Sequence, residues 1–275
     1  MPKGDETVND LPNPDIAWDP DSYMAFADLR SRPGLELLAR IQHPRPETIV
    51  DLGCGPGHLS AVLALRWPEA RVIGVDGSAE MLTRAESQFP KEKWPTIEWE
   101  HQDVSTWNPQ NPVSILYSNA ALHWLGDHRN LFPQLLSLIS SGGSMAVQMP
   151  DNWEEPSHTL IGRLTDDPRW RERAAPVFLG RPVAEPGEYR AWLEPQAAEV
   201  DQWRTTYFQS LTGPDPVLSW VKGSVLRPIL AVLEPEEREL FLSRLAADYR
   251  TAYPAGPDGT TALPFSRFFM VARRR

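Results

Sequence analysis

A glycine-rich turn and an acidic residue that follows it are the positions best suited to chemistry. Residues 51–57 read Asp-Leu-Gly-Cys-Gly-Pro-Gly and come directly after the apolar residues Ile49 and Val50. Closely spaced glycines let a ligand approach the backbone where any Cβ would collide. A second apolar run, 71–75, ends at Asp76, and an acid at this spacing can accept hydrogen bonds from ribose hydroxyls. The pattern predicts a nucleoside-binding crevice at the carboxyl edge of a parallel sheet.

The turn is poorly suited to phosphate. A dinucleotide fingerprint needs a third glycine where this sequence has His58, and Pro56 removes one backbone amide from the turn. A P-loop is excluded because no Gly-Lys-Ser/Thr follows. A nicotinamide oxidoreductase is therefore disfavoured.

The same residues resemble the first motif of the class I S-adenosylmethionine-dependent methyltransferases. In that family the turn holds the methionine part of the cofactor, and an acid after the second strand, here Asp76, binds the ribose. An acid after the third strand, here Asp103, accepts from the adenine amine. The purely structural alternatives are a helix cap for Asp76, for which Ser78 is the better candidate, and a turn role for Asp103. Cys54 is interpreted as a small buried filler rather than a reactive thiol.

The resemblance implies that S-adenosylmethionine is the cofactor and S-adenosylhomocysteine the product. The residues expected to contact it are Asp51, Gly53, Gly55, Gly57, Asp76, Gly77, Met81, Asp103, Val104 and Asn119.

Composition narrows the function further. The formal net charge of −10 argues against a nucleic-acid surface, although a few converging arginines can still bind a small anion. A single cysteine excludes an internal disulfide framework and a cysteine-based zinc site, and we expect no metal. The cysteine content fits a reducing compartment, and neither a long apolar run nor a signal-peptide pattern is present. We therefore expect a cytoplasmic protein with no membrane association; the sequence does not specify an oligomeric state.

Apolar periodicity predicts alternating strands and helices up to residue 150, which implies right-handed crossovers and a parallel sheet. Residues 1–16 are expected to form a disordered extension, and 20–41 a helix with a break near Pro33. Gly142 and Gly143 are expected to end a helix. The expected strands are 48–52, 71–76, 96–100, 113–118 and 144–149, with helices at 57–67, 78–88, 119–124 and 128–140.

After Pro150 the pattern changes, and prolines concentrate where we expect loops and helix starts. The expected elements are helices 157–165, 186–198, 214–232 and 235–252 and strands 199–208 and 264–273. This order resembles the Rossmann-like, seven-stranded methyltransferase sheet, mostly parallel with an antiparallel last strand. The chain is then one integrated α/β domain, with a cofactor-binding core at 17–150, a helical lid at 151–198, and the remaining strands at 199–275 around a second lid at 213–256.

The resemblance also extends into the lids. Similarity to the trans-aconitate 2-methyltransferase family lies in segments 17–20, 30–33, 119–124, 147–153, 200–207, 226–228 and 269–274. That family forms the monomethyl ester of trans-aconitate. The extension of about 16 residues before Trp18 and the proline-rich stretch 163–185 depart from the family pattern. Alternatives are an O-methyltransferase for another small carboxylic acid or a secondary metabolite, or a non-catalytic cofactor-binding homologue.

A carboxylate acceptor is ionised at neutral pH and needs positioning rather than a general base. We therefore expect no catalytic base, with Gln148 and Trp153 positioning the acceptor. Residues 118–125 lack the Asn/Asp-Pro-Pro-Tyr/Phe motif of methyltransferases that act on planar nitrogens. His123 is either a base for a hydroxyl or amine acceptor or, as we favour, a packing and hydrogen-bonding residue near the cofactor.

A tricarboxylate needs cationic partners, because each bidentate arginine contact contributes about 1.5–3 kcal/mol. Arg32, Arg204 and Arg227 are the candidates, and the alternative for each is an ordinary ion pair. Arg204 is the weakest, since strand alternation can direct it into a salt bridge. The expected acceptor-binding residues are Tyr23, Arg32, His123, Trp124, Gln148, Trp153, Arg204, Tyr207 and Arg227.

Overall fold

The computed structural model describes residues 31–178 and 180–275. Two compact units make up the chain. Unit 1 comprises the chain up to Met149 with Glu185–Trp203 and Phe269–Arg275, and unit 2 comprises Pro150–Ala184 and Arg204–Phe268. Tyr23, the expected extension and the first part of the expected helix 20–41 lie outside the described residues.

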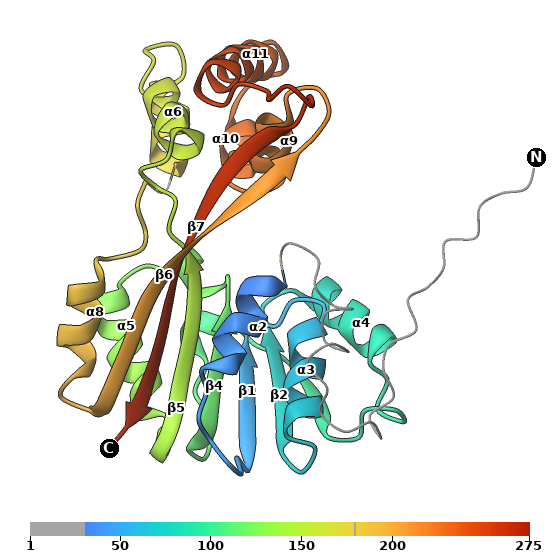
Figure 1. The fold of residues 1–275 in the computed structure, drawn as a ribbon, viewed down its shortest axis with the longest axis vertical. Helices are drawn as coiled ribbons and strands as arrows, with labels where there is room; N and C mark the ends of the chain where they lie inside the picture. The colour runs from blue at the N-terminus through green and yellow to red at the C-terminus, as the bar shows by residue number, and fades with distance from the viewer. Residues whose placement is uncertain (1–30, 179) are drawn as a thin grey trace, which may run out of the picture. The chain divides into compact units, whose positions relative to one another are not determined.

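The described strands form a seven-stranded sheet in the order β3-β2-β1-β4-β5-β7-β6 (Figure 1). Strands β1 to β5 pair in parallel, and the last strand, β7, is antiparallel. The predicted fold class is confirmed. The strands are β1 (Thr48–Leu52), β2 (Arg71–Asp76), β3 (Ile97–His101), β4 (Val113–Asn119), β5 (Ile139–Pro150), β6 (Ala197–Leu211) and β7 (Thr261–Arg274).

Helices cover both faces of the sheet in unit 1. The strand order proceeds from β1 toward β3 in one direction and from β4 toward β5 in the other, so right-handed crossovers place α3 and α4 on one face and α5 on the opposite face. Helix α2 packs against α3, and α8 packs against α5. The helices of this unit are α2 (Arg32–Ala39), α3 (His58–Arg66), α4 (Ala79–Gln88), α5 (His128–Ser137), α8 (Pro186–Leu193) and the short 3₁₀ turns η2 (Val104–Thr106) and η3 (Leu122–Trp124).

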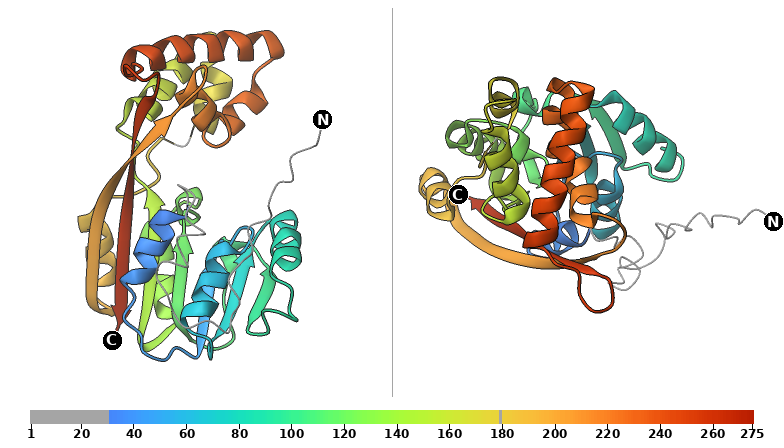
Figure 2. Two further views of the ribbon diagram at one scale, coloured as in Figure 1. Left: turned by 45° about the vertical axis from the view of Figure 1, so that its right-hand side comes forward. Right: turned by 90° about the horizontal axis from the view of Figure 1, so that it is seen from above.

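Unit 2 contains helices together with the part of β6 from Arg204 onward and the part of β7 up to Phe268. Helix α11 packs against α6 and α9, and Figure 2 shows it running between them. Trp170 and Phe241 meet edge to face in its apolar core. Its helices are α6 (Pro156–Thr165), α7 (Arg171–Ala174), η4 (Ala175–Val177), α9 (Pro216–Lys222), α10 (Leu226–Val232) and α11 (Pro235–Ala252).

Proline begins four of the described helices, α6, α8, α9 and α11, as the sequence predicted. The N–H of a first-turn residue has no hydrogen-bond partner within the helix, so a proline at this position removes no hydrogen bond. Its fixed φ also suits the helical conformation. Two of these starts are also capped. The carboxylate of Glu188 accepts from the Glu185 amide at 3.1 Å, and that of Glu237 accepts from the Glu234 amide at 2.9 Å.

The prediction that Gly142 and Gly143 end a helix is wrong. Helix α5 ends at Ser137, and both glycines lie inside β5. A Cβ on Gly143 would lie 2.5 Å from the Ser114 carbonyl oxygen, where β5 bulges against β4. The glycine therefore allows close approach of two strands, a long-range contact that mimics a helix stop in sequence.

Three other helix boundaries also differ. Residues 119–124 bend at Ala120 and form only the short turn η3, while the expected helix 214–232 is broken into α9 and α10. Helix α8 ends at Leu193, and the following strand β6 begins at Ala197, earlier than predicted. In the first and third cases strand pairing begins inside the range predicted as helical, and in the second α9 ends at Lys222, with Gly223 as its C-cap.

Candidate active site

The carboxyl ends of β1, β2 and β4 bring the predicted cofactor residues together in unit 1. Leu52 pairs with Val75 and Asp51 with Tyr117, so the turns after these strands are adjacent. The strand order reverses between β1 and β4, and ligands of open α/β sheets bind at such a switch point.

The glycine turn has the backbone that its composition predicted. Gly53, Gly55 and Gly57 have φ values of 79°, 55° and 85°, in the left-handed region that side chains rarely adopt. A Cβ on Gly53 would lie 2.2 Å from the Ala121 Cβ, and one on Gly57 would lie 2.4 Å from the Trp99 ring. Gly55 faces open space. Packing therefore requires the outer two glycines, while the middle one leaves room for a ligand.

Asp76 joins this turn to α4. Its carboxylate accepts from the Gly55 amide and from the Ser78 amide, both at 2.8 Å. Ser78 is the N-cap of α4 and accepts from the Met81 amide at 3.3 Å, which confirms the predicted cap. Gly77 is exposed next to it. Asp76 thus lies at the turn with an ionisable carboxylate held in place by backbone amides.

Asp103 begins η2 after β3. Its carboxylate accepts from the amide and the hydroxyl of Ser105, both at 2.8 Å, and these bonds lower the pKa of Asp103. Val104 is half-buried beside it. The Asp103 carboxylate is fully exposed and ionised, so it can accept a further hydrogen bond.

Asn119 ends β4 opposite Gln148 on β5. Its Oδ1 atom is buried and has no hydrogen-bond partner among the described residues. The next residue, Ala120, has φ 56° and donates its amide to the Gln148 carbonyl at 2.9 Å. A left-handed alanine is uncommon, and here the bend holds Ala121 against Gly53.

Asp51 lies beneath the turn and is only 2% exposed. Ser60 donates its hydroxyl to this carboxylate at 2.6 Å, a contact that sequence reasoning missed. Burial, with a smaller contribution from the charge of Asp76, raises the pKa of Asp51 to about 7 despite this bond. Burial also raises the pKa of the Cys54 thiol, which agrees with its interpretation as a filler.

The predicted acceptor residues of unit 1 have different environments. Gln148 is fully buried on β5, and His123 is buried with its ring 4.7 Å from that of Trp124, which is 51% exposed. Arg32 is exposed and pairs with Glu36 at 2.9 Å.

The remaining predicted acceptor residues lie in unit 2. Arg204 donates to Asp151 at 2.6 Å, so its side chain forms the salt bridge that strand alternation suggested. Arg227 is exposed at the start of α10, and Tyr207 is buried on β6. Trp153 packs edge-on against His158, and its indole N–H has no hydrogen-bond partner among the described residues.

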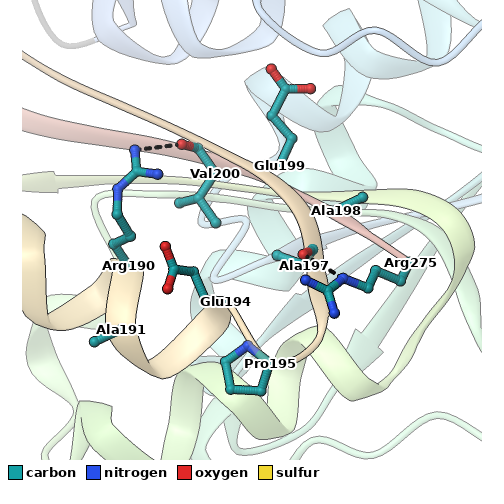
Figure 3. A pocket seen from close by; sticks show the side chains of 9 residues that line it. All are labelled: Arg190, Ala191, Glu194, Pro195, Ala197, Ala198, Glu199, Val200 and Arg275. Carbon is teal, nitrogen blue, oxygen red and sulfur yellow. Dashed lines mark hydrogen bonds between the residues drawn. The ribbon is translucent and has the colours of Figure 1, made fainter.

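Other features indicate no additional chemistry. No group of acidic, histidine and cysteine side chains in the described part of the chain could hold a metal ion. A hollow beside α8 contains Arg190 and Arg275, but each donates to a backbone carbonyl, of Val200 and Ala197 respectively, at 2.9 Å (Figure 3). Glutamates line the same hollow, so its charges are mixed. None of the described helices is long and apolar enough to cross a membrane.

Comparisons with known proteins agree with this geometry. A methyltransferase-domain family model matches residues 49–143. Phosphoethanolamine N-methyltransferase 2 of Haemonchus contortus, in complex with phosphomonomethylethanolamine and S-adenosylhomocysteine, superposes with a TM-score of 0.53 at 15% identity, covering 89% of this chain and 53% of that chain. The fold and the glycine-acid edge define a class I S-adenosylmethionine-dependent methyltransferase.

Sequence relatives identify the family within this class. Trans-aconitate 2-methyltransferase of Methylobacterium nodulans is 43% identical over 258 residues, which is 94% of this chain and 98% of the relative. That of an Azoarcus species is 42% identical over 257 residues, which is 94% of this chain and 99% of the relative. The chain belongs to the trans-aconitate 2-methyltransferase family.

The buried carboxyl of Asp51 predicts a pH-dependent stability. Its folded pKa of about 7 lies above the ordinary value of 3.8, so the stabilising protonated form is fully present below about pH 4 and is lost as the pH rises through about 7. Asp51→Asn should therefore gain stability relative to the unmodified protein between pH 5 and pH 8. A change of about 1 kcal/mol in the free energy of unfolding moves the Tm of a chain of this size by roughly 2–4 °C. We therefore expect the Tm of Asp51→Asn, relative to that of the unmodified protein, to rise by several degrees from pH 5 to pH 8.

Thermal melts without ligand at pH 5, 6.5 and 8 measure this difference. Glu86→Gln, which neutralises an exposed acid on α4, is the matched control and should follow the unmodified protein. A Tm difference between Asp51→Asn and the unmodified protein that stays constant across the three pH values would contradict the assignment.

Proposed function

We propose that the protein transfers a methyl group from S-adenosylmethionine to a carboxylate of trans-aconitate, a small anionic acid, and forms the monomethyl ester. The main support is the hydrogen bond from the Gly55 amide to the Asp76 carboxylate. It fixes the glycine turn beside the point where the strand order of a methyltransferase sheet reverses. Relatives of about 40% identity extend over both units, which supports the same acceptor. The single buried cysteine fits a reducing compartment, and we place the enzyme in the cytoplasm.

The charge of the turn favours a cationic ligand. Asp76 contributes a carboxylate here, and Pro56 removes an amide that a pyrophosphate would use. S-adenosylmethionine carries positive charge on its sulfur and its amino group, whereas a dinucleotide brings phosphates that this carboxylate would repel. We assign the ribose to Asp76, the adenine amine to Asp103 and the methionine part to the turn, with Gly77, Met81, Val104 and Asn119 completing the site.

The reaction needs alignment rather than proton transfer. When bound, the cofactor supplies an electrophilic methyl group: an acceptor carboxylate oxygen forms the new C–O bond while the methyl–sulfur bond breaks and its electron pair stays on sulfur. No proton moves, so the contribution of the chain is to orient the acceptor and exclude water. Gln148 and Trp153 are the proposed positioning residues, with His123, Trp124 and Tyr207 as walls.

We also propose that residues 151–198 and 213–256 act as helical lids that select the acceptor. Trp153 offers a buried indole N–H with no partner among the described residues, and Arg227 offers an exposed guanidinium. Arg32 pairs with Glu36 and Arg204 pairs with the buried Asp151, so binding an acceptor through either arginine requires exchange of an existing carboxylate partner.

An acceptor panel tests the function. Transfer of a labelled methyl group should give the highest kcat/KM with trans-aconitate, lower values with cis-aconitate, citrate and itaconate, and at least about 100-fold lower values with fatty acids, which lack the additional charge-assisted contacts. Preference for a fatty acid or a neutral hydroxyl compound would overturn the proposal.

The absence of a general base predicts a flat pH profile. With both substrates saturating, kcat should change little between about pH 6.5 and 8.5, because the acceptor carboxylate is ionised throughout this range. His123→Asn should keep the same profile. A rise of tenfold per pH unit that disappears in His123→Asn would instead assign His123 as a base.

If Asp76 binds the ribose, Asp76→Ala should bind S-adenosylhomocysteine more weakly. Loss of a charged acceptor should weaken S-adenosylhomocysteine binding by roughly 10- to 100-fold, since hydrogen bonds to charged groups contribute about 1.5–3 kcal/mol. Calorimetric titration measures this affinity. The control is Glu80→Ala, which removes an exposed carboxylate from the first turn of α4. Unchanged affinity in a folded Asp76→Ala variant would remove Asp76 from the site.

A further inference from the structure

A buried polar row lies on one face of the strands of unit 2. The hydroxyls of Thr206 and Ser266 meet at 2.8 Å, which places these residues opposite each other on β6 and β7. Alternation then directs Tyr207, Gln209 and Arg267 to the other face. Burial agrees with this register, because these three side chains are 4–8% exposed while Phe208 is 74% exposed.

Asn152 joins the same row from the end of β5. The Asp151 amide donates to the Ser266 carbonyl at 2.9 Å, so the adjacent residue, Asn152, lies beside this part of β7. Asn152 is 1% exposed and donates its amide to His158 at 3.2 Å, but its Oδ1 atom has no hydrogen-bond partner among the described residues. The Oε1 atom of Gln209 is also buried and has no hydrogen-bond partner among the described residues. Buried polar atoms usually have a hydrogen-bond partner, so these two oxygens are available to a polar ligand.

Arg267 provides the charge of this row. Its guanidinium lies 4.5 Å from the centre of the Phe265 ring, and burial lowers the pKa of Arg267 to about 10, partly opposed by Tyr207. The group remains charged at neutral pH. Burying a cation costs stability, and strongly perturbed ionisable groups concentrate at functional sites.

Arg267 differs from the arginines that the sequence nominated. The Arg32 side chain is 62% exposed, and its exposed ion pair with Glu36 contributes little. The Arg204 side chain is 45% exposed and already pairs with the buried carboxylate of Asp151. A guanidinium removed from water binds a carboxylate more strongly, and its planar fork matches both oxygens. The sequence carried a signal for it: Arg267 occupies an inward position in the alternation Leu263, Phe265, Arg267, Phe269.

We propose that the row formed by Asn152, Tyr207, Gln209 and Arg267 binds a carboxylate of the acceptor that is not methylated, with Arg267 as the bidentate partner. The row thereby selects acids with two or more carboxylates, since a monocarboxylic acid has only the reacting group. This inference rests on the proposed carboxyl methyltransferase function and names the residues that determine its acceptor class.

The test compares acceptors with three, two and one carboxylates in the full-length enzyme. Arg267→Met keeps the apolar stem and removes the charge, so it should raise KM for trans-aconitate by roughly 10- to 100-fold, change kcat less, and leave S-adenosylhomocysteine affinity unchanged. Arg267→Lys, which keeps the charge but loses the fork, should give an intermediate KM. Discrimination between tricarboxylate and monocarboxylate acceptors should shrink by the same factor.

Arg71→Met is the matched control, because Arg71 is exposed at the first residue of β2 and pairs with Glu98; its kinetics should equal those of the unmodified enzyme. Gln209→Leu is the second variant, which perturbs the row without removing a charge and should raise KM for trans-aconitate severalfold.

An unchanged KM for trans-aconitate in folded Arg267→Met, or an equal loss for all acceptors, would overturn the inference. Should Arg267→Met fail to fold, an unchanged KM in Gln209→Leu would overturn it. Failure of the unmodified enzyme to methylate any carboxylic acid would instead overturn the proposed function.

Discussion

The hydrogen bond between the Gly55 amide and the Asp76 carboxylate is the contact on which the rest of the site depends. It joins the turns after β1 and β2 at the point where the strand order reverses. Because parallel strands end at one edge, Asp76, Asp103 and Asn119 lie at the same edge of the sheet without being close in sequence. The left-handed glycines make this contact possible, since a side chain at Gly53 would collide with Ala121.

Each unit contains a buried ionisable group that costs stability. In unit 1 the Asp51 carboxyl lies under the turn with Ser60 as its donor, and in unit 2 the Arg267 guanidinium lies over Phe265. Their signs match the ligands that each unit is proposed to bind, a sulfonium nucleoside and a carboxylate. Burying an ionisable group costs stability, and such groups concentrate at functional sites, so we attribute both to ligand binding.

Much of the fold was predictable from local pattern. The bounds of β1 and β2 and those of α11 agree with the predicted ranges, because apolar periodicity, a proline start and a cap all indicate the same element. Prediction was wrong where a long-range contact replaced a local signal. Gly142 and Gly143 have the composition of a helix stop, yet they lie in β5 because β4 approaches Gly143 closely.

The sequence by itself predicted this edge of the sheet, because Gly53, Gly55, Gly57 and the acid that follows, Asp76, all belong to one β-α-β unit of consecutive elements, β1, α3 and β2. Only the tertiary structure decided which charged side chains form ion pairs and which are buried. Arg204 meets Asp151 across 53 positions, and Arg267 is buried because β6 and the end of β5 flank β7. Which strands pair is a long-range property, so the burial of an arginine cannot be obtained from its neighbours in the chain.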